Sequence, residues 1–257
     1  MKYALTLTIG MLMFFSVSLG FSGIRETATL KQKYKDAIDA GTDAAAKYTT
    51  YLNEENLYGL SNGFGEGYKD SLNIQLDKEE SLKWFYRVFF RNMGIDENTE
   101  FADQVKKYIP IKALIGFDRV YIANEEDVWI EEKPFNIEYN GQEYLFTLSN
   151  QIKDLTTDTW LNINDIGLNQ VTKDTLLNQF IKDSIERAAN NRTDKESELY
   201  YTINIGMNEN DPKFTSIQGV SFVVLVEGLP IPSKNLFNPS EKFYAFSIGG
   251  SQIIRKN

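Results

Sequence analysis

The feature that most constrains this chain is an uncharged segment of 21 residues from Ala4 to Ile24. As a helix, a segment of this length spans about 30 Å, which is the thickness of the hydrocarbon core of a bilayer. Lys2 precedes the segment and Arg25 follows it, which favours an amino terminus inside the cell and a remainder outside. We therefore predict a single membrane-spanning anchor over residues 1–24.

Two other interpretations of this segment stay open. A cleaved signal peptide would use residues 4–17 as its apolar region and Ser18-Leu19-Gly20 as a small-x-small cleavage site before Phe21. A buried core helix is the third interpretation. We favour the anchor because the apolar run continues past that site. With an anchor or a signal peptide, the chain after about residue 25 is extracytoplasmic, either tethered to the cell membrane or secreted.

Residues 25–53 predict an amphipathic stalk helix without a proline. Its apolar positions recur every three or four residues, so they share one face. Small residues on such a face let a second helix or a sheet approach closely. The face either packs on its own domain alone or also packs between subunits. The candidate packing and assembly residues are Ala37, Ile38, Gly41, Ala45 and Tyr48.

These two helices, followed by a mostly β domain, resemble the plan of type IV pilins and pseudopilins. The stretch from Ala37 to Ala46 looks like the Ala-rich segment after the anchor in TadE-type pseudopilins. The chain departs from ordinary prepilins because Gly20-Phe21 falls at the end of the apolar stretch and not before it. Twenty Lys against seven Arg resemble the usage of many Gram-positive bacteria. The resemblance implies a pilin-like surface protein whose partners are other pilin-like subunits or secretion machinery.

The remainder, residues 54–257, predicts an α+β domain with an antiparallel sheet. Asp77 and Glu80 form a capping box for a helix that ends at Gly94. Two further helices are expected over residues 98–108 and 172–190. Strands are expected over residues 111–123, 127–130, 135–139, 143–148, 200–206, 219–226, 243–248 and 252–254. Asn140-Gly141 predicts a type I′ hairpin, and residues 150–170 predict a loop.

Two groups of residues are candidates for binding. Tyr58, Phe64 and Tyr68 are interleaved with glycines in residues 53–76, and they form the best candidate binding loop. The acidic groups at 125–127 and 131–132 predict a solvated sheet edge that discourages strand addition. Weak cation binding or acid–base chemistry by these carboxylates are the alternatives.

Composition then excludes most familiar catalysis. The chain has no His and no Cys, so it has no Ser–His or Cys–His catalytic pair and no ordinary zinc site. Its formal net charge of −9 argues against nucleic-acid binding. We predict a non-enzymatic, membrane-anchored, pilin-like surface subunit without a cofactor. The alternatives are a binding or adhesin-like module that acts alone and an extracellular hydrolase that uses carboxylates.

Overall fold

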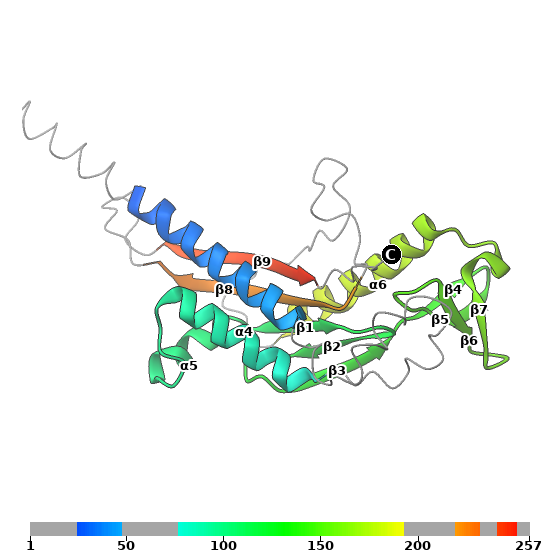
Figure 1. Ribbon diagram of the computed structural model, residues 1–257, viewed down its shortest axis with the longest axis horizontal. Helices are drawn as coiled ribbons and strands as arrows, with labels where there is room; N and C mark the ends of the chain where they lie inside the picture. The colour runs from blue at the N-terminus through cyan, green and yellow to red at the C-terminus, as the bar shows by residue number, and fades with distance from the viewer. Residues whose placement is uncertain (1–24, 48–76, 193–218, 232–240, 251–257) are drawn as a thin grey trace, which may run out of the picture.

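The computed structural model describes residues 25–47, 77–192, 219–231 and 241–250 of the chain. These residues form helices on both faces of a five-stranded antiparallel sheet, with a four-stranded antiparallel sheet at one end (Figure 1). The predicted α+β class and its antiparallel pairing are confirmed. The predicted helix that is first hydrophobic and then amphipathic is described only from residue 25, because residues 1–24 lie outside the described ranges.

Four α-helices are described. They are the helix over residues 25–47, α4 (Lys78–Met93), α5 (Glu100–Lys106) and α6 (Gln170–Asn190). The ends of α4 confirm the predicted N-cap at Asp77 and the predicted end at Gly94, whereas only the Asp77 half of the predicted capping box is present. The Asp77 side chain accepts a hydrogen bond from the Glu80 backbone N–H at 2.9 Å, and Gly94 ends the helix at a left-handed φ of 75°.

The five-stranded sheet has the order β3-β2-β1-β8-β9. Its strands are β1 (Ile111–Ile115), β2 (Arg119–Ala123), β3 (Trp129–Pro134), β8 (Ser221–Pro230) and β9 (Lys242–Gly250). The expected strand over residues 111–123 is in fact a hairpin of two strands. The Gly116 N–H donates to the Arg119 carbonyl at 2.8 Å and closes the turn between them.

The four-stranded sheet has the order β4-β5-β6-β7. Its strands are β4 (Asn136–Tyr139), β5 (Gln142–Leu145), β6 (Gln151–Asp154) and β7 (Thr159–Asn162). The β4–β5 hairpin confirms the predicted turn, since Asn140 and Gly141 have φ values of 53° and 77°. The loop predicted over residues 150–170 is wrong. That stretch contains β6, β7 and the 3₁₀ helix η1 (Ile163–Ile166).

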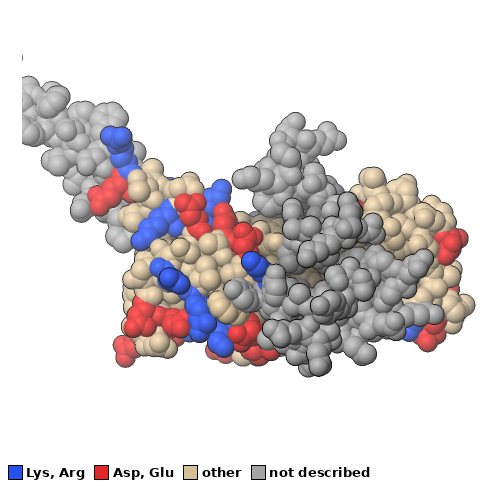
Figure 2. Space-filling view, in the orientation of Figure 1, with Lys and Arg blue, Asp and Glu red and all other residues tan. Residues whose placement is uncertain are grey.

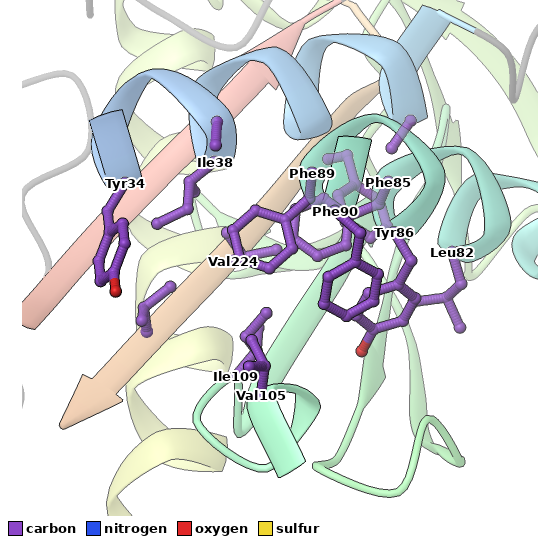
Figure 3. Close-up of a cluster of buried hydrophobic side chains, with 14 of the residues drawn as sticks. Tyr34, Ile38, Leu82, Phe85, Tyr86, Phe89, Phe90, Val105, Ile109 and Val224 are labelled. Atoms are coloured by element: carbon purple, nitrogen blue, oxygen red, sulfur yellow. The ribbon is translucent and has the colours of Figure 1, made fainter. Parts of the chain in front are cut away.

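Two hydrophobic cores lie on opposite faces of the five-stranded sheet. The side chains of β1 alternate between the two faces of the sheet. Ile111, Ala113 and Ile115 face α6 and the smaller sheet, and Leu114 faces the other side. On that second face, helix 25–47 and α4 pack over β8 (Figure 3). Strands β1 and β8 read as nearly continuous apolar runs because both of their faces are covered.

The membrane prediction needs correction. Within the described ranges, no helix combines the length and the apolar run that a membrane span requires. This finding conflicts with the single-pass membrane anchor predicted from the sequence, and we do not retain that assignment. Residues 4–24, on which the prediction rested, lie outside the described residues.

Candidate functional site

The predicted packing stripe of helix 25–47 lies inside the fold. Ala37 is 1% exposed, and Ile38 and Ala45 are completely buried against α4 and the sheet. A Cβ atom added to Gly41 would lie 3.0 Å from the Phe85 ring, so this glycine allows α4 to approach closely. The stripe thus packs on its own chain. Packing between subunits stays a prediction, and Tyr48 lies outside the described residues.

The opposite edge of helix 25–47 meets the end of β9 even more closely. A Cβ atom on Gly249 would lie 2.1 Å from the Thr42 carbonyl carbon, so only a glycine fits under the helix backbone there. Two hydrogen bonds fix the contact. Ser247 Oγ donates to Asp39 Oδ1 at 2.7 Å, and it lies 3.1 Å from Thr42 Oγ1. Burial and the neighbouring Asp39 raise the pKa of the Asp43 carboxyl.

A third polar contact lies under α4. Lys112, in the centre of β1, is completely buried, and its Nζ lies 2.7 Å from Asp127 Oδ1. The Tyr86 hydroxyl donates to the same Oδ1 at 2.6 Å. Burial lowers the pKa of the Lys112 ammonium, and the nearby Asp127 opposes that shift. Burial also raises the pKa of Tyr86 well above its ordinary value, so its hydroxyl stays protonated.

The acidic groups beside this contact are only partly solvated. Glu132 lies 2.6 Å from Arg119 Nη1 and 3.7 Å from Lys78 Nζ. Hydrogen bonds from the guanidinium to Asp118 and Glu132 raise the pKa of Arg119. Glu79 accepts a hydrogen bond from the Trp129 indole at 2.9 Å. The acidic groups at the predicted solvated edge therefore also connect the start of α4 to β2 and β3, through ion pairs and a hydrogen bond.

Two more buried charges lie on the α6 side of the sheet. Arg192 Nη1 lies 2.7 Å from Glu227 Oε2, and both side chains are nearly buried. Lys173 is 1% exposed, and its Nζ lies 3.8 Å from Asp174 Oδ1. Burial lowers the pKa of Lys173 to about 8. Both sites are ion pairs inside the fold.

Of the packing and binding-loop candidates, the structure describes Ala37, Ile38, Gly41 and Ala45, which share one buried helix face. Tyr58, Phe64 and Tyr68 lie outside the described residues. No group of three or more carboxylates that suits a metal ion occurs in the described part of the chain. Sequence reasoning missed Lys112, although a lone lysine inside the apolar run Ile111–Ile115 was a usable signal. It also missed the contact of Asp39 with Ser247, for which sequence spacing gives no signal.

Comparison with known proteins identifies no relative. No protein-family model matches the chain, and neither a curated protein nor a solved structure matches it at a significant level.

Proposed function

We propose that this protein is a non-enzymatic, exported structural subunit of pilin-like plan, which acts by packing against other subunits. One observation carries the proposal. The helix over residues 25–47 lies along an antiparallel sheet and is bound to it through small residues (Figure 1). This arrangement is the one that the resemblance to pilins and pseudopilins implies for the chain.

The inner stripe of helix 25–47 is occupied, so contacts between subunits must use its outer face. That face is exposed at Ala28, Gln32 and Asp36. A groove of about 670 Å³ runs there between the helix and the end of α4. Acidic and basic side chains are interspersed over this side of the molecule (Figure 2). Mixed charge favours contacts with another protein surface over contacts with a polyanion.

The buried polar contacts support a non-enzymatic role. A catalytic group must reach a substrate, whereas Lys112 is buried beside Asp127 and Ser247 is buried and hydrogen-bonded to Asp39. Glu132 pairs with Lys78 of α4 and with Arg119 of β2. Asp127 pairs with Lys112 of β1 and accepts a hydrogen bond from Tyr86 of α4. These residues stabilise the structure, so contacts through the surface are the simplest mode of action.

A binding module that acts alone is the second candidate, and one observation favours it. Ala37, Gly41 and Ala45, which were candidates for packing on their own domain alone or also between subunits, meet α4 and the sheet of their own chain. Leucine at Gly41 or Ala45 would therefore perturb the fold as well as any assembly. Substitutions at these two positions cannot separate the two functions, and the decisive experiment must use exposed positions.

Photo-crosslinking from single cysteines separates the two candidates. The chain has no Cys, so Gln32→Cys and Val171→Cys each offer one thiol for a maleimide–benzophenone label. Val171, which is 77% exposed on α6, is the matched control. Irradiation of the exported full chain should link it to further copies or to other subunits from position 32 and not from position 171. Monomers alone, or equal linkage from both positions, would refute the assembly proposal.

A further inference from the structure

The contact between Lys112 and Asp127 brings a buried amine close to a carboxyl group. The Lys112 side chain is 0% exposed, and its Nζ lies 2.7 Å from Asp127 Oδ1. This contact is a close approach and not an aligned hydrogen bond, because Nζ has no hydrogen-bond partner in the described structure. The Asp127 carbonyl carbon lies one carbon–oxygen bond from Oδ1, so Nζ is at most about 4 Å from that carbon.

Local structure holds both groups in place. Lys112 belongs to the central strand β1, where neighbouring strands fix its backbone on both sides. Asp127 lies in the turn between β2 and β3 at a φ of 62°, a conformation that L-residues seldom adopt. Asn124 supports this turn, since its Oδ1 accepts hydrogen bonds from the N–H groups of Glu126 and Val128. The turn therefore presents the Asp127 side chain to the amine with little freedom to move.

We propose that Lys112 and Asp127 condense into an intramolecular isopeptide bond. Once a proton has passed from the Lys112 ammonium to the Asp127 carboxylate within this contact, the amine attacks the carbonyl carbon of the carboxyl group. A bond forms between Nζ and this carbon, and one carbon–oxygen bond breaks. The departing oxygen leaves as water after it takes a proton from the amine. Atoms and electrons balance without an oxidant, a metal or a cofactor, and the chain loses one molecule of water.

The surroundings favour two requirements of this step, a neutral amine and a stabilised carbonyl oxygen. Burial disfavours the charged amine, so it raises the fraction of the nucleophilic neutral form. The Tyr86 hydroxyl donates to Asp127 Oδ1 at 2.6 Å, which polarises the carbonyl and stabilises the negative charge that develops on its oxygen. Tyr86 thus acts directly on the reacting carboxyl group. A near-attack distance of about 3–3.5 Å requires the amine to advance by less than about 1 Å.

Peptide mapping of the full-length protein tests the proposal directly. Trypsin cleaves after lysine and arginine, except before proline, and an acylated Lys112 resists cleavage. We expect a branched product that joins residues 108–119 to residues 120–153, with a mass 18 Da below the sum of the two peptides. Fragmentation should place the branch between Lys112 and Asp127. Complete cleavage after Lys112, with both peptides unmodified, would overturn the proposal and leave an ordinary buried ion pair.

Two controls accompany the map. Lys106 and Asp103 form a comparable ion pair at 2.9 Å on the surface, so cleavage after Lys106 should stay complete in the same digest. Lys112→Arg keeps the positive charge but cannot form this amide, so the branched product should disappear. A branched product of the same mass in Lys112→Arg would show that the bond lies elsewhere and would refute the assignment.

Discussion

Gly249→Ala gives the sharpest test of how helix 25–47 is held. The new Cβ would lie 2.1 Å from the Thr42 carbonyl carbon and 2.3 Å from the Asp43 nitrogen. Carbon atoms in contact are normally about 3.5–4.0 Å apart, so the helix would have to move away by roughly 1.4 Å or more. Main-chain atoms of a helix cannot rotate away as a flexible side chain can. The whole helix must shift, or β9 must bend.

The cost of Gly249→Ala follows from these contacts. Overpacking of a tight contact costs about 1–3 kcal/mol. The shift would also break the hydrogen bond from Ser247 to the Asp39 carboxylate, which contributes about 1.5–3 kcal/mol. Alanine in place of glycine regains about 0.5–1 kcal/mol in a strand. The free energy of unfolding should therefore fall by about 2–5 kcal/mol.

Urea unfolding monitored by circular dichroism measures this change, with Gly250→Ala as the matched control. A Cβ atom on Gly250 would lie 3.5 Å from Ser221 Oγ, which is an ordinary contact. Gly250→Ala should therefore change the free energy of unfolding by less than about 1 kcal/mol. The reasoning fails if Gly249→Ala unfolds at the same urea concentration as the unmodified protein, or if the two variants lose equal stability.

Three further predictions concern charges and a helix cap. Lys173→Met should raise the free energy of unfolding by up to about 3 kcal/mol below pH 8, because a pKa lowered from 10.5 to about 8 means that the charged amine opposes folding. That penalty shrinks as the pH rises from 8 to 10.5, so the gain from Lys173→Met should shrink across the same range in urea titrations. Arg192→Ala should lower the free energy of unfolding in urea by about 3–5 kcal/mol, because it leaves the buried Glu227 without its partner. A decrease no larger than that from breaking an exposed ion pair would contradict this prediction. Asp77→Ala should cost about 1 kcal/mol in thermal unfolding, because the Glu80 N–H loses its cap, whereas Asp77→Asn should cost little.

The elements that short-range chemistry determines were predictable from the sequence. Asp77 and Gly94 marked the two ends of α4, and Asn140-Gly141 marked the β4–β5 hairpin. Strands β6 and β7 were missed because each is four residues long and the surrounding stretch is rich in Asn and Asp. In β6, Ile152 is the one buried apolar residue, so the strand lacks the alternation of apolar and polar residues from which a strand is predicted.

The polar contacts were not predictable, because they join residues that only the folded chain brings together. Ser247 and Asp39 are separated by 208 positions. Lys112 and Asp127 are closer in sequence, but their meeting depends on the unusual backbone of the turn before β3. The small-residue stripe was recognised from its spacing alone. Spacing cannot tell whether the surface that meets such a stripe belongs to the same chain or to another one.

The order of strands in the larger sheet has a consequence for how the chain folds. Strand β1 pairs with β2 immediately, yet its other edge stays open until β8 has been made, about a hundred residues later. Helix 25–47 can pack fully only later still, because part of the surface on which it packs belongs to β9. Such long-range pairings slow folding, and the apolar edge of β1 meanwhile invites aggregation. The larger sheet is therefore complete only after β9 has been synthesised, so its central strands keep open edges through most of the synthesis of the chain.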